Sequence, residues 1–362
     1  MRFLSVTCIL SAALLSECFM PRFRFFLMSP LKILLVAGFF FAAAGLIGVP
    51  AAEAAKAMLL MDASSGRILY SQNADRRIAP ASLTKVMSMF LALDAVKTKK
   101  TSLSKKVKVS RRAAAQGGSR MGLKRGERVS LHRLLMGMAV SSGNDASMAV
   151  AEHIAGSGEK FVRLMNHKAR QLGMRSTTFK TPNGLPARGQ VTTARDMGKL
   201  ARAYLRAHPS SLQKYHRVKV LRHNGAVTRN KNPLLGTCSG ADGLKTGWVT
   251  ASGYNIISTV RRGKTRLIAV VLGADSGAAR SQEVRKLVEA GFTAKKRGVS
   301  VASVLSGKAH AGKKQSGKIA RKSSAQAATS RQTVVRSQER RVQVEKASRN
   351  RQTAARHAPA RS

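Results

Sequence analysis

The sequence predicts an α/β fold of the α+β type, in which one antiparallel sheet takes strands from both ends of a domain and a helical block is inserted between them. Three observations support this prediction: strand-like segments just after residue 57, helical periodicity through the middle of the domain, and strand-like segments again near residue 250. Strands followed by helices and then by strands do not give the regular alternation of a parallel sheet. Helices are therefore expected to flank the antiparallel sheet.

The first predicted element is a β-hairpin, because the apolar segments 57–61 and 67–70 flank a Ser-Ser-Gly turn. A helix of good periodicity, rich in Leu, Met and Ala, is predicted over 82–96. The domain is predicted to close with the strand-like runs 248–260 and 266–272 and a helix over 282–292. The other predicted helices lie between these elements: 131–140, 145–155, 161–172 and 193–207.

Residues 1–54 are predicted to be an export leader. An apolar run over 31–49 follows basic residues, and the A-x-A pattern at 52–54 fits a signal-peptide cleavage site. An uncleaved membrane anchor is the alternative, since about nineteen apolar residues can just span a bilayer. Both interpretations place the rest of the chain in the periplasm or cell envelope, which excludes genomic DNA and most RNA as partners.

The chain is strongly basic, with 65 Lys and Arg against 16 Asp and Glu and a net charge of +49. Such a balance indicates a polyanionic partner. Residues 295–362 hold eighteen of the basic residues, two acidic residues and no Phe, Trp or Tyr, so they cannot bury enough apolar surface to fold. We predict a disordered cationic tail there and a folded domain over 55–294. The tail either holds the protein to anionic wall polymer or membrane lipid, or is solvated without a dedicated partner.

Chemistry is predicted first at Ser82-Leu83-Thr84-Lys85. An S-x-x-K pattern also begins at Ser29, Ser102, Ser157 and Ser211, about as often as chance gives. Ser82 differs from these because Pro80, just before it, disfavours helix upstream, and because Ser82 begins the predicted helix with the clearest periodicity. Side chains at i and i+3 share one helical face, about 5–6 Å apart, so a neutral Lys85 amine can take the proton of the Ser82 hydroxyl. The other four are predicted to be ordinary Ser and Lys residues at the surface.

Two further motifs, Ser142-Gly143-Asn144 and Lys245-Thr246-Gly247, each have a structural alternative. The first lies between two predicted helices, where a turn would present Ser142 and Asn144 to a cleft, but these residues also suit a helix N-cap. The second begins a strand-like run, where Gly247 would let a ligand approach the backbone closely. A β-turn is the alternative for this motif.

In this order the three motifs are the signature of penicillin-binding proteins and class A β-lactamases, with S-G-N in place of S-D-N. The chain resembles the low-molecular-mass penicillin-binding proteins that are serine-type D-alanyl-D-alanine carboxypeptidases. The likeness covers about residues 57–294. It extends to the following segments: 60–66, 79–87, 142–146, 181–185, 193–197 and 243–247.

The resemblance implies a β-lactamase/transpeptidase-like fold with an inserted helical subdomain. It implies a hydrolase that removes the terminal D-alanine from peptidoglycan stem pentapeptides through an acyl-enzyme on Ser82, with β-lactams as covalent inhibitors. Lys85 is then the base, and Ser142 relays a proton to the leaving amine. No metal-ligand cluster or phosphate-binding loop occurs in the sequence, so neither a metal nor another cofactor is expected.

The remaining motif residues are assigned to substrate binding by the same resemblance. Asn144 would hold the peptide backbone, and Lys245 and Thr246 would bind the terminal carboxylate beside Gly247. The backbone N–H groups of Ser82 and Trp248 would form the oxyanion hole.

Two features of the chain depart from the pattern of the family. Val249 stands where many relatives have Thr, and the cationic tail replaces a β-rich domain and an amphipathic anchor.

Other activities are also possible for these motifs. A β-lactamase would need a deacylating glutamate, for which Glu159 is the nearest candidate, although its surroundings resemble a helix start. A DD-endopeptidase or transpeptidase would use the same residues, and an inactive wall-binding relative is the non-enzymatic alternative.

Overall fold

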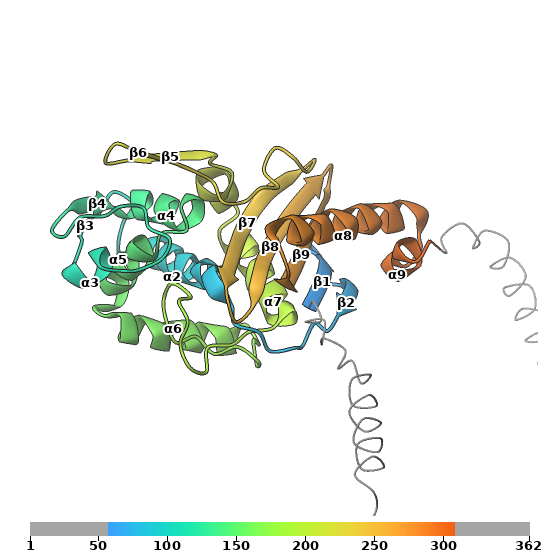
Figure 1. Ribbon diagram of the computed structural model, residues 1–362, viewed down its shortest axis with the longest axis horizontal. Coiled ribbons are helices and arrows are strands. Elements are labelled where there is room, and N and C mark those ends of the chain that lie inside the picture. The colour runs from blue at the N-terminus through green and yellow to red at the C-terminus, as the bar shows by residue number, and fades with distance from the viewer. Residues whose placement is uncertain (1–56, 308–362) are drawn as a thin grey trace, which may run out of the picture. The chain divides into compact units, whose positions relative to one another are not determined.

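A computed structural model of the chain describes residues 57–307, and the predictions for residues 1–54 and beyond 307 lie outside this part. Its centre is a five-stranded sheet with the order β2-β1-β9-β8-β7, in which every neighbouring pair is antiparallel. The first two strands and the last three meet in one sheet, as predicted (Figure 1). Their bounds are β1 Ala57–Asp62, β2 Ile68–Gln72, β7 Ala241–Val249, β8 Gly253–Arg262 and β9 Thr265–Ala274.

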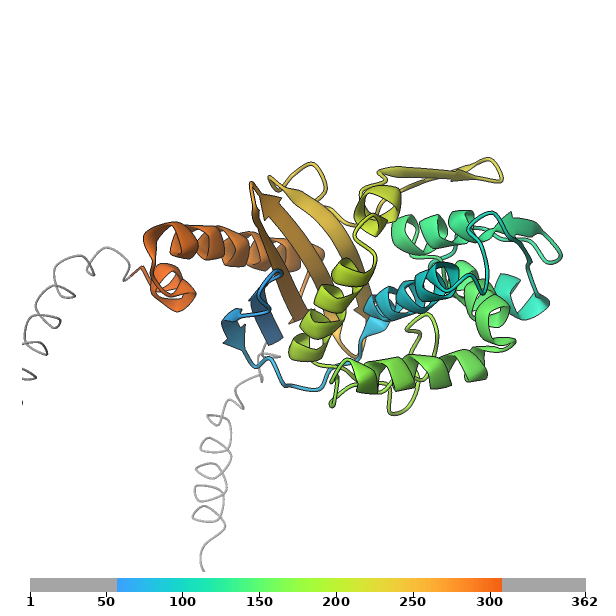
Figure 2. The ribbon, with the colours of Figure 1, turned by 180° about the vertical axis from the view of Figure 1, so that it is seen from behind.

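Helices cover both faces of the sheet. Along β9 the side chain of Leu267 enters one apolar core and that of Ile268 enters the other, because successive side chains of a strand point to opposite faces. Figure 1 shows α8 (Gly277–Arg297) in front of the sheet, and Figure 2 shows α7 (Ala194–Ala207) on the opposite face. The sheet is therefore the middle layer of the domain.

The inserted helices form a block beside the edge strand β7 (Figure 1). The predicted helix over 82–96 is present, but its first turn is a 3-10 helix that passes into an α-helix. The other predicted helices of the block lie close to their predicted bounds. The elements of the block are η1 Ala81–Thr84, α2 Lys85–Lys97, α3 Arg111–Ala114, α4 Leu131–Val140, α5 Asn144–Ala155 and α6 Gly158–Gln171.

The long strand-like run predicted over 248–260 is wrong, because the chain turns after Val249 and forms two strands. Ser252 N donates to Val249 O across this turn, and Gly253 has a φ of +61°, a conformation that favours glycine. The K-T-G motif consequently lies in the middle of β7 and does not begin a strand.

The predicted boundary of the folded domain after residue 294 is also wrong. The helix α8 continues past it, and a further helix, α9 (Val301–Leu305), follows. Val301 is 3% exposed and packs into the core beneath α8, while Lys295 Nζ donates to the buried Asp62 carboxylate at 2.5 Å. These tertiary contacts order a segment whose composition resembles that of a tail.

Several short elements carry no periodic signal in the sequence and were not predicted. They contribute two small two-stranded sheets, only one of which is a hairpin, and a π-helical turn that contacts β7. None of the helices between residues 57 and 307 combines the length and the hydrophobicity that crossing a membrane requires. Besides α3 and α9, the unpredicted elements are β3 Lys106–Lys108, β4 Arg128–Ser130, η2 Leu212–His216, β5 Val220–His223 and β6 Ala226–Arg229.

Candidate active site

Ser82 and Lys85 lie where η1 passes into α2. Side chains three residues apart nearly eclipse one another in a 3-10 turn, and the Lys85 Nζ lies 2.9 Å from the Ser82 Oγ. Lys85 is fully buried, whereas Ser82 keeps part of its surface accessible. The pair therefore combines a reachable hydroxyl with an amine that is shielded from water.

Two further contacts of the Lys85 amine determine whether its lone pair or an N–H bond faces the Ser82 hydroxyl. Its Nζ lies 2.7 Å from Asn144 Oδ1 and 2.6 Å from the Asn183 carbonyl oxygen. Both of these oxygens can only accept hydrogen bonds. A neutral amine has two N–H bonds and one lone pair, so donation to the two oxygens leaves the lone pair for the proton of the Ser82 hydroxyl. This is the arrangement that a general base requires.

The electrostatic surroundings favour the neutral amine. Burial lowers the pKa of Lys85 well below its usual value, and the nearby charges of Lys245 and Lys231 lower it further, while Asp145 opposes them. Burial, together with the charges of Lys231 and Arg280, lowers the pKa of Lys245 to about 7. Excess positive charge in a dry site thus disfavours protonation of the base and leaves the site attractive to an anion.

The Asn144 side chain connects the base to the loop opposite it. Its Oδ1 accepts from Lys85, and its Nδ2 donates to Gly117 O at 2.7 Å. These two contacts fix which way the amide points and leave one amide hydrogen for a ligand. Asn144 therefore contacts the lysine, and the peptide contact predicted for it stays a prediction.

Ser142 sits in the tight turn between α4 and α5. It has a φ of +60°, which non-glycine residues adopt at a cost, and such strain clusters at functional sites. Ser142 as a whole is 3% exposed. The N-cap alternative is wrong, because Gly143 occupies the cap of α5 without a side-chain hydrogen bond. The strained turn thus holds Ser142 between α4 and α5, and its role in proton transfer stays a prediction.

The K-T-G motif lies in the edge strand β7 and packs closely against the turn that carries Ser82. A Cβ on Gly247 would lie 2.9 Å from Ser82 N and 3.0 Å from Ala81 Cβ, so a side chain there would push η1 away from β7. The β-turn alternative for this motif is wrong, since all three residues pair with β8. Because β7 is an edge strand, one of its sides is not used in the sheet.

The other residues of this strand alternate along it. Lys245 is buried and its Nζ donates to Thr246 O at 2.7 Å. The side chains of Thr246 and Trp248 lie on the same face, because side chains two residues apart in a strand do so. Trp248 is 54% exposed, which is unusual for the largest apolar side chain.

Three residues of the site were missed in the sequence analysis as functional candidates. Asn183 contacts Lys85 through its backbone, and only the wider family likeness over 181–185 pointed to its segment. Lys231 donates to Ser119 Oγ at 2.6 Å and lowers the pKa of both other lysines. Arg280 is buried, and its Nε has no hydrogen-bond partner among the described residues. Neither Lys231 nor Arg280 belongs to a spacing pattern that sequence could reveal.

The competing candidates are placed elsewhere. Ser157 caps α6, with its Oγ accepting from Lys160 N at 3.1 Å, and Ser102 Oγ contacts Ser104 Oγ; Ser29 lies outside the described residues. Ser211 lies at the start of η2 and is 1% exposed, so the surface position predicted for it is wrong. Glu159 is exposed in the first turn of α6 and paired with Arg112. Between residues 57 and 307, no group of three or more His, Cys, Asp and Glu side chains could hold a metal ion.

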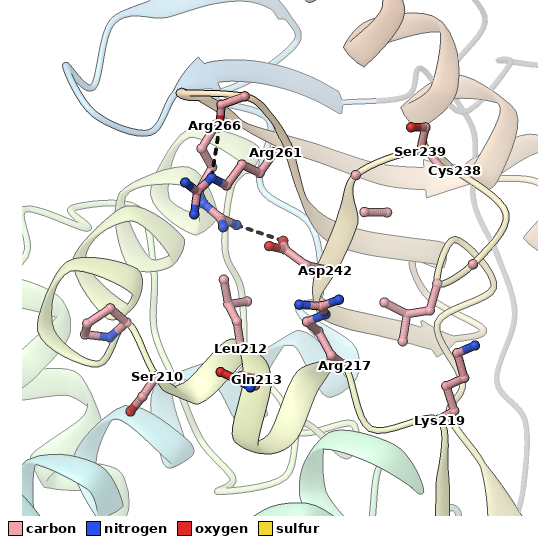
Figure 3. Close-up of a pocket in the computed structure, with 16 residues that line it drawn as sticks. Ser210, Leu212, Gln213, Arg217, Lys219, Cys238, Ser239, Asp242, Arg261 and Arg266 are labelled. Atoms are coloured by element: carbon pink, nitrogen blue, oxygen red, sulfur yellow. Dashed lines mark hydrogen bonds and ion pairs between the residues drawn. The ribbon is translucent and has the colours of Figure 1, made fainter.

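A separate hollow of about 680 Å³ lies at the other end of β7, where that strand begins (Figure 3). Arg217, Lys219, Arg261 and Arg266 line it, and Arg266 is paired with Asp242 at 2.7 Å. None of the residues of the three motifs lines this hollow, so these arginines and this lysine form a basic surface that is separate from the Ser82 site.

A serine at a helix start, contacted by a buried lysine whose pKa is lowered and lying beside a K-T-G edge strand, defines a serine acyl-transfer site of the penicillin-binding protein class. The comparison of the whole sequence with known families agrees. The chain belongs to the D-alanyl-D-alanine carboxypeptidase family, peptidase family S11, which matches residues 47–276.

Individual relatives cover the same region. D-alanyl-D-alanine carboxypeptidase DacF of Bacillus subtilis is 38% identical over 247 residues, 67% of this chain and 63% of that protein. DacC of Escherichia coli is 40% identical over 259 residues, 70% of this chain and 64% of its own. The chain thus spans slightly less than two thirds of the length of these relatives.

Solved structures show the same fold. Penicillin binding protein 6B from Escherichia coli superposes with a TM-score of 0.63 at 40% identity, covering 66% of this chain and 78% of that one. Penicillin-Binding Protein D2 from Listeria monocytogenes, in its ampicillin-bound form, gives a TM-score of 0.60 at 33% identity, covering 66% and 97%. The predicted β-lactamase/transpeptidase-like fold is confirmed.

Proposed function

We propose that the protein is a serine-type D-alanyl-D-alanine carboxypeptidase that removes the terminal D-alanine from peptidoglycan stem pentapeptides. The observation that carries this proposal is the fully buried Lys85 amine, 2.9 Å from Ser82 Oγ and held by two acceptor oxygens. Family membership supports the choice of substrate. The cell envelope is the corresponding site of action.

Acylation begins when Ser82 Oγ attacks the carbonyl carbon between the two D-alanines and Lys85 takes the hydroxyl proton. Negative charge develops on the carbonyl oxygen, where the backbone N–H groups of Ser82 and Trp248 donate to it. The C–N bond then breaks, and the Ser142 hydroxyl passes a proton to the leaving amine while it regains one from Lys85. The products of this step are free D-alanine and an ester on Ser82.

Deacylation repeats the same proton transfers with water as the nucleophile. Lys85, neutral again, takes a proton from the water that attacks the ester carbonyl. The ester bond breaks, and Ser82 Oγ recovers its proton as the shortened peptide leaves. The depressed pKa of Lys85 supports both steps, because a protonated amine could accept no proton.

Recognition of a free C-terminus follows from the positive charge around β7. Lys245 and the Thr246 hydroxyl are assigned to the terminal carboxylate, and Lys231 and Arg280 add positive charge beside them. A buried guanidinium with an unpartnered Nε is costly unless an anion completes its hydrogen bonds. This cationic end of the site favours a carboxypeptidase over an enzyme that cleaves within a chain.

A β-lactam is expected to acylate the same serine, as the ampicillin- and cefotaxime-bound structures of the Listeria protein suggest by analogy. Ampicillin incubated with the full chain should add one adduct, and tryptic digestion should place it on the peptide 78–85. The Ser82→Ala variant should carry no adduct. An adduct on another peptide, or equal labelling of both proteins, would contradict the assignment of the nucleophile.

A further inference from the structure

The basic hollow at the start of β7 takes no part in the proposed mechanism. Its volume of about 680 Å³ lies in the range of pockets that bind small organic ligands. Residues from three separate segments line it: 209–219, 235–242 and 261–266 (Figure 3). None of the large apolar side chains that are exposed between residues 57 and 307 belongs to this lining. Charge is therefore the main chemical feature of the hollow.

Most of the positive charge in the hollow has no acidic partner. Arg217 and Lys219 are exposed, and their side chains make no hydrogen bond or ion pair with residues 57–307. Arg261 is also exposed, and its Nε donates to the Gly263 carbonyl oxygen at 3.1 Å. These three cationic side chains therefore keep N–H groups that a ligand can use.

The hollow contains one acidic side chain, that of Asp242, which already has partners. Its Oδ1 accepts from Arg266 Nη1 at 2.7 Å and from Thr259 Oγ1 at 2.6 Å. Four basic lining side chains against one acidic side chain leave a net charge of +3. A hollow that is lined by charges of one sign concentrates ions of the opposite sign. An anion is therefore the ligand that this lining favours.

The arrangement of the cations indicates a phosphate group. A carboxylate has two oxygens in one plane, and the planar fork of one guanidinium binds both of them. Here Arg217 and Arg261 come from separate segments and line one space, which suits the tetrahedral oxygens of a phosphate (Figure 3). Arginine is also the side chain that proteins favour for phosphate recognition.

The size and the lining of the hollow favour a polymer over a membrane lipid as the source of the phosphate. A volume of about 680 Å³ leaves room for the units on either side of one phosphate group. Surfaces that lie on a bilayer combine basic side chains with exposed apolar ones. The large apolar side chains exposed within residues 57–307 lie outside this lining.

We propose that this hollow binds a phosphodiester polymer, with Arg217, Lys219 and Arg261 in contact with its phosphate oxygens. The hollow shares no residue with the Ser82 site, so the polymer can stay bound while that site reacts. An anionic polymer of the cell wall has the required chemistry. This binding site is independent of the proposed catalytic function.

The test must report the hollow itself, because a chain with a net charge of +49 will bind polyanions at other places too. Phenylglyoxal modifies exposed guanidinium groups, and mass spectrometry identifies which arginines have reacted. A short synthetic oligo(glycerol phosphate), added to the full-length protein at low ionic strength, should protect Arg217 and Arg261. Arg163 and Arg170, which are exposed on α6, should stay reactive.

The Arg217→Gln variant should need about fivefold more oligomer for half-protection of Arg261, the effect of one exposed charge pair. Arg163→Gln is the matched control, because it removes the same charge from α6, and it should leave that concentration unchanged. Both variants should still form the ampicillin adduct on Ser82, which shows that they are folded. If Arg217→Gln does not fold, the protection pattern of the wild-type protein decides.

Equal protection of the α6 arginines and of Arg217 and Arg261 would overturn the site, as would unchanged protection of Arg261 in a folded Arg217→Gln variant. An oligoglutamate of equal charge tests the chemistry, and equal protection by it would overturn the selectivity for phosphate. Vesicles that contain phosphatidylglycerol test the source. Protection by these vesicles but not by the oligomer would overturn the assignment to a polymer. Each of these outcomes concerns the hollow alone and leaves the proposed function standing.

Discussion

Replacement of Lys85 with methionine is expected to lower kcat/KM for D-Ala-D-Ala peptides by about 10³-fold or more. General-base catalysis contributes about 10²–10⁴-fold, and the serine hydroxyl has no second base within the described contacts of Ser82 Oγ. Methionine has a similar length but no proton acceptor of comparable strength. Steady-state kinetics on a synthetic peptide would measure the loss.

Stability must be separated from catalysis in this variant. Lys85→Met leaves Asn144 Oδ1 and Asn183 O without a buried donor, which costs about 1–3 kcal/mol for an unsatisfied group. Lys85→Arg restores donors but keeps its proton at any working pH, so it should be equally inactive. Activity of the arginine variant within tenfold of wild type would contradict the role of Lys85 as base.

Replacement of Gly184 with alanine is expected to lower kcat/KM by about 10²-fold, although this residue contacts no substrate in the proposed mechanism. Gly184 has a φ of +84°, and an added Cβ would lie 1.8 Å from Ala81 O and 2.9 Å from Thr84 Oγ1. The η1 turn or the facing loop must therefore move, and a displacement of about 1 Å near reacting groups can cost about 10²-fold. Peptide kinetics and thermal unfolding would be measured together.

Gly173→Ala is the matched control for that variant. Gly173 also has a positive φ, +69°, but a Cβ there would meet no atom within 4 Å. It carries the same kind of backbone strain without the collision against η1. If both alanine variants lost activity equally, close packing of residue 184 on the nucleophile turn would not explain the effect.

The layout of the fold was predictable because its signals are local. Helical periodicity in 131–140 and 145–155 and the hairpin near residue 57 are properties of short windows, and the structure confirms them. The division between β7 and β8 was missed although a local signal was present. Ser252 and Gly253 form a Ser-Gly pair, which is a turn signal like the one used at residues 64–66, but the apolar residues on both sides made the run look continuous.

In the candidate site, too, local contacts were predictable from the sequence and contacts between distant residues were not. Ser82 and Lys85 share one turn of helix, so spacing alone predicted that they meet. The contact between Lys85 and Asn144 joins residues 59 positions apart, and only the three motifs taken together pointed to it. Lys231 and Arg280 affect the lysines through space, and no local pattern distinguishes them from the many other basic residues of the chain.

The most direct test of the central claim is mass spectrometry of a stem pentapeptide ending in D-Ala-D-Ala after incubation with the full chain. The account predicts that the wild-type protein removes one alanine and that the Ser82→Ala variant leaves the peptide intact. An intact peptide with both proteins, or the same loss with both, would contradict a serine carboxypeptidase that acts through Ser82.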